Sequence, residues 1–195
     1  MAKLEIITGP MFSGKSEELI RRLKRATYAE QNVLVVKPII DTRSDKKILA
    51  RRKKDKREQK FEEFDSFPAH EVNSAEEFIK LVSTHNPNVL AIDEAQFFSE
   101  WLLDLINELL DKNEDTDFTI IVSGLDMDAW KKPFGIMPQL MAIADEVAKL
   151  TAICFNCKKP ANLTYKKSGS NSQKIDVGDS EKYGARCRTC HKLPA

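Results

Sequence analysis

The sequence predicts an α/β fold, with a parallel β-sheet flanked by helices. Four nearly continuous apolar runs indicate strands that are buried on both faces, and segments with helical periodicity separate them. The first run leads into a glycine-rich segment that opens a helix. Strands that alternate with helices form right-handed parallel sheets whose ligands bind at the carboxyl ends of the strands. We therefore expect the functional site at that edge.

The expected elements follow one another in a regular order. Strands are expected over Lys3–Thr8, Val33–Lys37, Val89–Ile92 and Phe118–Ser123. One helix should run from Lys15 to about Glu30, a second should start at the capping box Ser74-Ala75-Glu76-Glu77 and run toward Val82, and a third carries the apolar stripe Leu102, Leu105, Ile106 and Leu109. Between Arg43 and Lys60 a cationic run with almost no apolar residues predicts a mobile loop or a solvated helix.

Length and composition limit the class of protein. The 195 residues allow one α/β domain and a small appendage, which we place at residues 1–150 and 151–195. The apolar content of 42% supports a core, and a net charge of +1 gives no general attraction to nucleic acid or acidic membranes. No apolar stretch has the length of a membrane span, and the first residues lead directly into a strand. A cytoplasmic location is expected.

Residues 9–16 carry the strongest functional pattern. Gly9-Pro10-Met11-Phe12-Ser13-Gly14-Lys15-Ser16 fits G-x-x-x-x-G-K-[ST], the P-loop of nucleotide-binding proteins. Glycines let backbone N–H groups close around phosphate oxygens, and the following helix directs its positive dipole end at them. In this pattern Lys15 reaches the β- and γ-phosphates and Ser16 ligates Mg²⁺. The alternative is an incidental glycine turn, but the strand-then-helix context favours a P-loop NTPase (RecA-like) fold that binds a nucleoside triphosphate.

An apolar strand that ends in two acids is the second pattern. Asn88-Val89-Leu90-Ala91-Ile92-Asp93-Glu94 matches the Walker B pattern, in which Asp93 holds Mg²⁺ together with Ser16. Glu94 could accept a proton from the group that attacks the γ-phosphoryl group. The alternative is that Glu94 only caps the helix that follows. Whether water or a substrate hydroxyl attacks separates an ATPase from a kinase.

Four cysteines form two C-x-x-C pairs, Cys154/Cys157 and Cys187/Cys190. In a reducing compartment such pairs suit a closed tetrahedral zinc site, which is structural rather than catalytic. A redox dithiol is the alternative, although thioredoxin-like context is missing. His191 could replace one ligand, but the regular spacing favours cysteine.

The stretch between the two pairs, from Lys166 to Ser180, is rich in Gly, Ser, Asn and Asp. Anchored by zinc at its base, it could fold over a ligand, or it could be a disordered loop. Aromatic residues near the predicted site include Phe97, Phe98, Trp130, Phe134 and Tyr183. Most aromatics belong to cores, and Phe97 is the best candidate for stacking on a base.

Together these motifs resemble the zinc-containing, cellular-type (type II) thymidine kinases over nearly the whole chain. The P-loop is shared by many NTPases, whereas the P-loop, Asp93-Glu94-Ala95-Gln96-Phe97-Phe98 and the two cysteine pairs in this order are specific. The remaining carriers of the resemblance are Asp41-Thr42-Arg43, Gly124-Leu125-Asp126, Lys132-Pro133-Phe134-Gly135 and Lys149-Leu150-Thr151-Ala152. The resemblance implies transfer of the γ-phosphoryl group of ATP to the 5′-hydroxyl of thymidine, giving dTMP for DNA synthesis. It also implies a homotetramer with feedback inhibition by dTTP.

The resemblance further implies roles for individual residues. Glu94 corresponds to the general base, Lys15 and Arg43 to phosphate contacts, and Ser16 with Asp93 to the Mg²⁺ site. The ATP site also includes the rest of the P-loop, Ala95 and Gln96. The thymidine site includes a lasso that reads the base through its main chain, and its residues are Lys174, Ile175, Asp176, Val177, Gly178, Tyr183 on the sugar, Thr164 and Leu125 lining the base pocket, and Phe97 against the ring.

Two departures from the family pattern stand out. The family usually places phenylalanine at the position of Ala129, where this chain has an alanine followed by Trp130, so that contact is not carried over. The loop after Asp41-Thr42-Arg43 usually contains a polar motif with a glycine, and here Arg51-Arg52-Lys53-Lys54 stands instead.

Two other classes of function remain as alternatives. One is a P-loop ATPase with a nucleic-acid-binding zinc ribbon, supported by the basic run but opposed by the short chain and near-neutral charge. The other is a purely structural zinc protein, which leaves Lys15, Ser16, Asp93 and Glu94 without an explanation.

Overall fold

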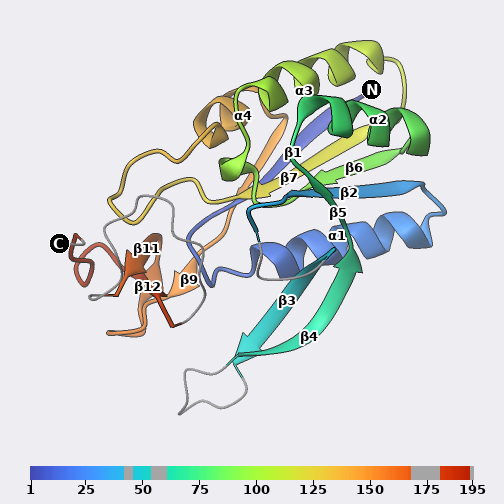
Figure 1. Ribbon diagram of the computed structural model, residues 1–195. Helices are drawn as coiled ribbons and strands as arrows, with labels where there is room; N and C mark the ends of the chain where they lie inside the picture. The colour runs from blue at the N-terminus through green and yellow to red at the C-terminus, as the bar shows by residue number, and fades with distance from the viewer. Residues whose placement is uncertain (42–45, 54–60, 168–180, 194–195) are drawn as a thin grey trace.

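A six-stranded, wholly parallel sheet forms the centre of the molecule (Figure 1). The computed structural model describes residues 1–41, 46–53, 61–167 and 181–193, with only the backbone described at 51–53 and 61–64. The strand order is β5-β2-β6-β7-β1-β8. The strands are β1 (Lys3–Thr8), β2 (Val33–Pro38), β5 (His70–Val72), β6 (Val89–Ile92), β7 (Thr119–Gly124) and β8 (Glu146–Lys149). This arrangement confirms the predicted α/β fold class.

Helices cover both faces of the sheet, and alternate strand residues supply the two cores. The helices α2 (Ala75–His85), α3 (Trp101–Lys112) and α4 (Met137–Ile143) lie on one face, where Leu4 and Ile6 of β1 point. Helix α1 (Lys15–Tyr28) lies on the other face and packs Leu19, Ile20 and Leu23 against Ile7. The continuous apolar runs of the strands follow from this double coverage.

The sequence signals at the ends of α2 are also confirmed. The hydroxyl of Ser74 accepts a hydrogen bond from the N–H of Glu77, at 3.3 Å, and the carboxylate of Glu77 accepts one from the N–H of Asn73. The helix ends at His85 because Asn86 adopts the left-handed conformation. The predicted start of this helix was therefore right to the residue.

The prediction of a loop or solvated helix between Arg43 and Lys60 is wrong for Lys47–Lys53. This segment is the strand β3, and it pairs antiparallel with β4 (Phe61–Pro68) to form a hairpin beneath α1 (Figure 1). Ile48 and Ala50 are buried against α1, so two apolar side chains at a spacing of two decide the structure. The density of lysine and arginine hid this alternation. Residues 42–45 and 54–60 lie outside the described part.

Two short edge strands, β5 and β8, escaped prediction. Their sequences, His-Glu-Val and Glu-Val-Ala-Lys, lack the continuous apolar character of the central strands because an edge has one neighbour and more solvent. The helix after the P-loop ends at Tyr28, two residues before the expected end.

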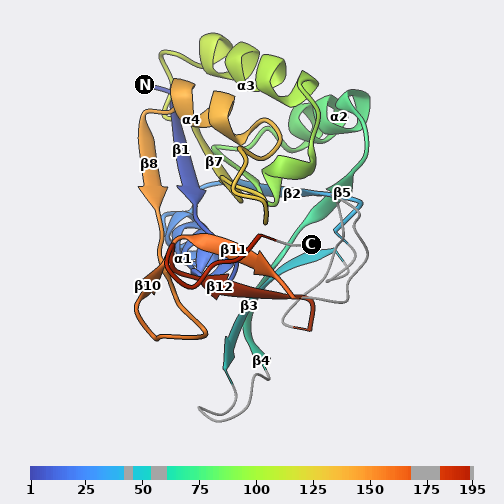
Figure 2. The ribbon, with the colours of Figure 1, turned by 90° about the vertical axis from the view of Figure 1, so that its left-hand side faces the viewer.

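The C-terminal residues form a small module of two-stranded sheets beyond the carboxyl ends of β1 and β8 (Figure 2). It contains β9 (Ala152–Ile153) paired with β10 (Pro160–Ala161), and β11 (Leu163–Lys166) paired with β12 (Tyr183–Arg186). No helix in the described part of the chain is long and apolar enough to cross a membrane. The domain boundary near Leu150 stays a prediction.

Candidate active site

The P-loop connects β1 to α1 at the carboxyl edge of the sheet. Thr8, the last residue of β1, donates its hydroxyl to the carbonyl of Gly124 at the end of β7, 2.9 Å away, and so ties the two strand ends together. Gly9 follows with a φ of 138°. A Cβ at this position would lie 2.4 Å from the carbonyl oxygen of Leu150, so only glycine lets the chain pass here.

Lys15 lies across this loop rather than pointing into solvent. Its side chain is buried and its ammonium group donates to the carbonyl of Pro10, at 3.0 Å. The hydroxyl of Ser13, buried in the same loop, has no hydrogen-bond partner within the described residues. A buried hydroxyl and an ammonium group beside a helix N-terminus are suited by their chemistry to bind phosphate oxygens.

Glu94 is the first residue after the Walker B aspartate, and its backbone is strained. Its φ of 52° places a non-glycine residue in the left-handed region, which costs free energy unless the surroundings fix it. The side chain makes no capping bond to the short helix η1 (Ala95–Phe97), so the capping alternative fails. The Glu94 carboxylate instead accepts a hydrogen bond from the side-chain amide of Gln96.

Gln96 links Glu94 to the end of β7. Its amide nitrogen donates to Glu94, and its amide oxygen accepts from the backbone N–H of Leu125, at 2.9 Å. Gly135 lies directly against the Gln96 backbone, and with a φ of 53° a Cβ there would be 2.3 Å from the Gln96 carbonyl oxygen. Gln96 is thus buried with both ends of its amide engaged, and it holds the carboxylate of Glu94 in one orientation.

The oxygen atoms at this edge suit a magnesium ion. Asp93 is buried at the end of β6, and its backbone N–H donates to the carbonyl of Val36. Ser16 stands in the first turn of α1. Hydroxyl and carboxylate oxygens are the donors that Mg²⁺ prefers, so Ser16 and Asp93 fit this metal by chemistry.

A buried lysine, Lys37, supports the start of the segment that leads to Arg43. Its ammonium group donates to the carbonyl of Asp41, at 3.0 Å, and lies 3.6 Å from the carboxylate of Glu71. The sequence offered one signal for this role, a charged residue at the end of an otherwise apolar strand. Arg43 itself lies outside the described residues.

The four cysteine sulfurs gather in one place, all within 4.8 Å of one another, and could hold a metal ion. Burial raises the pKa of Cys154. The backbone N–H groups of Cys157, Cys187 and Asn156 together outweigh this effect, and the pKa is lowered to about 6. The N–H of Lys159 lowers the pKa of Cys157, but burial and the neighbouring thiols raise it to about 11. The backbone N–H of Cys190 lowers the pKa of Cys187 as well. A cluster in which two thiols ionise readily and a third resists ionisation is suited to a cation that neutralises the thiolates.

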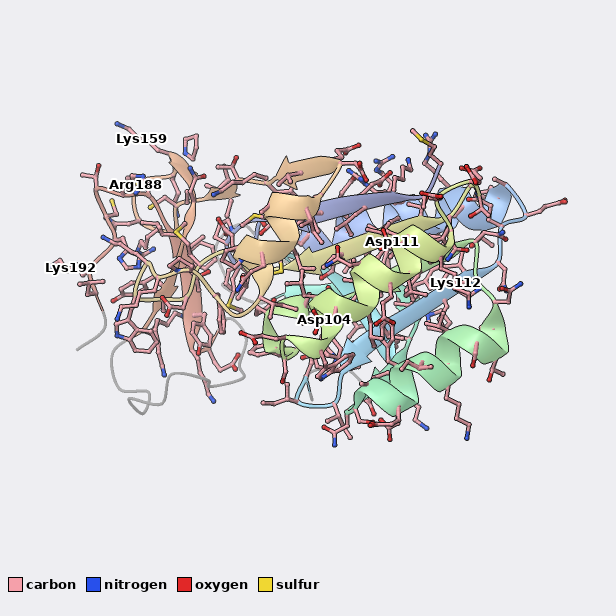
Figure 3. The ribbon with its side chains drawn as sticks, turned by 90° about the horizontal axis from the view of Figure 1, so that it is seen from above. Asp104, Asp111, Lys112, Lys159, Arg188 and Lys192 are labelled. Atoms are coloured by element: carbon pink, nitrogen blue, oxygen red, sulfur yellow. The ribbon has the colours of Figure 1, made fainter. Side chains whose placement is uncertain are left out.

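His191 does not join this cluster of sulfurs. Its Nε2 lies 3.0 Å from the carbonyl oxygen of Thr164, and burial lowers the pKa of the ring. Lys159, Arg188 and Lys192 lie at the end of the module that is farther from the sheet, whereas Asp104 and Asp111 lie along α3 (Figure 3).

The remaining predicted substrate residues are spread over three elements. Phe97 is half-buried and packs edge-to-face against Phe134, with ring centroids 5.7 Å apart. Tyr183 starts β12, opposite Lys166 of β11. Thr164 is buried, and its hydroxyl accepts from the N–H of Met11 in the P-loop, at 3.1 Å. Residues 174–178 lie outside the described part of the chain.

The departure at Ala129 has a structural counterpart. Ala129 is buried, and the ammonium group of Lys166 lies 5.8 Å from the centre of the Trp130 ring. The large aromatic ring therefore packs with β11 one position later than the family pattern places it.

Sequence reasoning missed Phe155. Its ring lies 5.2 Å from that of Phe12 in the P-loop. The available signal was an aromatic residue inside a C-x-x-C pair, where exposed polar residues are common.

A hollow of about 580 Å³ lies at the opposite edge of the sheet, under the last turns of α1. Lys3, Arg21, Arg22 and Arg25 contribute positive charge there, and Glu5 and Glu146 oppose it. The residues that line this hollow do not include the P-loop.

Comparison with known proteins gives consistent matches. The sequence pattern of the thymidine kinase family matches residues 2–191. A thymidine kinase of Mesomycoplasma hyopneumoniae strain 7448 is 42% identical over 190 residues, which is 97% of this chain and 95% of the relative. A thymidine kinase of Mycoplasma mobile is 43% identical over 188 residues, or 96% of this chain and 86% of the relative.

Proposed function

The chain belongs to the thymidine kinase family, and from this premise we propose that it is an enzyme that phosphorylates thymidine with ATP. The γ-phosphoryl group passes to the 5′-hydroxyl and gives dTMP. The observation that carries the proposal is the carboxylate of Glu94, which Gln96 fixes at the same sheet edge as the P-loop. A fixed carboxylate there suits proton transfer from an alcohol rather than simple nucleotide storage.

In the proposed mechanism the P-loop binds the triphosphate, with the backbone N–H groups of residues 11–16 and the dipole of α1 directed at the β- and γ-phosphates. Lys15 leaves the carbonyl of Pro10 and neutralises phosphate charge. Glu94 takes the proton of the 5′-hydroxyl as its oxygen attacks the γ-phosphorus, and ADP leaves with the electrons of the broken P–O bond. Ser16 and Asp93 would hold Mg²⁺, which screens charge on the phosphates.

The nucleoside is proposed to lie between the sheet edge and the C-terminal module. Phe97 would stack on the base, Leu125 and Thr164 would line its pocket, and Tyr183 would contact the sugar. Residues 174–178 would close over the base through their main chain. Arg43 and Ala95 complete the proposed nucleotide contacts.

The four cysteines are proposed to hold a structural zinc ion. Their support is the sulfur cluster and a donor set without carboxylates, which favours zinc. Because such a site needs reduced thiols, a cytoplasmic location is proposed. A homotetramer, inhibition by dTTP, and the absence of membrane and nucleic-acid partners follow the family expectation and are proposed with it.

The proposal is tested by a phosphate-transfer assay over a panel of nucleosides and nucleotides, with zinc measured on the same sample. We expect rapid, ATP-dependent phosphorylation of thymidine and strong discrimination against thymidine monophosphate, whose 5′-oxygen is already esterified. Efficient use of the monophosphate would reassign the protein to monophosphate phosphorylation. Salt-dependent DNA binding without thymidine-dependent ATP turnover would favour the zinc-ribbon ATPase instead.

Glu94→Gln tests the proposed base. Loss of the proton acceptor should lower kcat by at least ~10²-fold and leave ATP affinity nearly unchanged, because the amide keeps the shape of the side chain. Steady-state kinetics and calorimetric ATP binding measure the two quantities. Glu100→Gln, an exposed acid before α3, is the matched control and should behave as wild type. Near-wild-type turnover of Glu94→Gln would remove the residue from this role.

A further inference from the structure

The C-terminal module contacts the P-loop. These contacts are separate from the roles proposed above for the residues of the module in binding the nucleoside and zinc. The arm formed by Gly9, Met11 and Phe12 faces this module, whereas Gly14 and Lys15 belong to the start of α1. On the α1 side the N–H of Glu18 donates to the carbonyl of Gly14 at 2.9 Å, an ordinary first helical turn. The other arm is linked to α1 through the ammonium group of Lys15, which donates to the carbonyl of Pro10, and it otherwise depends on its neighbours.

Thr164 is the first of these contacts. Its hydroxyl accepts the backbone hydrogen bond of Met11 at 3.1 Å, and its own carbonyl lies 3.0 Å from the Nε2 of His191, the residue after Cys190. Thr164 is buried and stands opposite Ala185 in the β11–β12 pair. One residue therefore joins the P-loop directly to the segment that carries the second cysteine pair.

Phe155 is the second contact. It lies between Cys154 and Cys157, and its backbone N–H donates to the carbonyl of Ala185, at 3.0 Å. Its ring packs at 5.2 Å from the ring of Phe12, which is among the residues packed on the small core of the module. Phe12 has a φ of 65°, so this packing compensates for a left-handed backbone within the loop.

The connection between β8 and β9 makes the third contact. The N–H of Leu150 donates to the carbonyl of Thr8 at 2.7 Å, which brings the carbonyl of Leu150 against Gly9. Three successive parts of the loop arm therefore rest on residues 150–164. A phosphate site binds tightly when its N–H groups are already in position, because ordering them on binding costs affinity.

We propose that the C-terminal module acts as a brace that holds the P-loop in its binding conformation. Thr164 and Phe155 are then positioning residues for the nucleoside triphosphate. The inference rests on the proposed function for the identity of the ligand. The C-terminal module then contributes to binding of the phosphate donor, in addition to its proposed contacts with the nucleoside. Disturbing the module should weaken binding of ATP even when thymidine is absent.

The test is calorimetric binding of a non-hydrolysable ATP analogue with Mg²⁺, without thymidine, with zinc content measured on each sample. Thr164→Val should weaken binding roughly 5-fold, the effect of one lost hydrogen bond, and Thr164→Ser should restore it. Phe155→Ala should weaken binding by a similar factor, and removal of zinc by a chelator should weaken it on the order of 10-fold or more. Tyr165→Phe, the next residue of β11, is the matched control and should bind as wild type.

Hydrogen exchange gives a readout that is independent of affinity. Amides of Gly9 and of residues 11–16 should exchange faster in Thr164→Val and in Phe155→Ala, while amides of β7 stay protected. Wild-type affinity and exchange in Thr164→Val would overturn the proposal, whatever the zinc content of the Phe155 variant. A wild-type protein that binds ATP but does not phosphorylate thymidine would instead overturn the proposed function and leave the brace intact.

Discussion

At the level of single residues, the candidate site contains a buried glutamine whose side-chain amide is hydrogen-bonded at both ends. Gln96 was predicted as a nucleotide contact, and that role stays a prediction. Its side chain spans Glu94 and the N–H of Leu125, two residues with separate proposed roles in proton transfer and base binding. One side-chain amide therefore links the residue that follows the end of β6 by two positions to the residue directly after β7.

Gln96→Leu is predicted to lower kcat by about 10-fold or more, because it removes the donor to Glu94 and leaves the buried N–H of Leu125 without its acceptor. The KM for ATP should change little. Gln139→Leu, an exposed glutamine of α4, controls for the change of residue type. Steady-state kinetics with each substrate varied would contradict the positioning role if only the KM for ATP rose.

At the level of elements, helix α1 is joined to the sheet by a charge network as well as by its apolar stripe. The guanidinium of Arg22 pairs with Glu5 of β1, with Glu18 one turn earlier and with Glu146 of β8. These pairs connect α1 to β1 and to the edge strand β8. The hydrogen bonds that Glu18 accepts from Arg21 and Arg22 lower its pKa, whereas burial raises it. The hydrogen bonds outweigh burial, and the pKa falls from 4.5 to about 2.

Glu18→Gln is predicted to remove a small stabilising contribution that the wild type has near neutral pH and loses in acid. A carboxyl group with a lowered pKa stabilises the fold above pH 4.5, and this contribution is lost as the pH falls toward 2. The variant should be less stable at pH 7, by under ~1 kcal/mol for partly exposed pairs, and equal to wild type near pH 2. Urea unfolding at several pH values measures the difference. Glu17→Gln, one position earlier, should not reproduce it.

At the level of the whole molecule, the C-terminal module lies beyond the carboxyl ends of β1 and β8 (Figure 2). Its core is small and consists of Ala152, Cys154, Ala161 and Ala185, so apolar burial alone gives it little stability. A bound metal would supply folding free energy that such a core lacks. Through the proposed brace, metal binding to the module would therefore stabilise the conformation of the P-loop.

Cys187→Ser is predicted to lower zinc content, to lower the thermal unfolding midpoint and to raise the KM for thymidine, because the strand pair β11–β12 loses its anchor. Metal analysis, thermal unfolding and kinetics on one preparation measure the three effects. Thr189→Ala, an exposed residue between Cys187 and Cys190, is the matched control. Unchanged zinc in the serine variant would show that the ligands are assigned wrongly.

The sequence alone determined the P-loop, the Walker B strand and the paired cysteines. Each of these features is defined by residue types at a short, fixed spacing along the chain. It also determined the central strands, because residues buried on both faces leave continuous apolar runs. Tertiary structure decided what local pattern cannot carry. Ile48 and Ala50 become a strand only against α1, Gln96 bridges β6 and β7, and Phe155 and Thr164 reach the P-loop from more than a hundred residues away. Such contacts depend on which surfaces meet, and a single sequence read along its length does not record that.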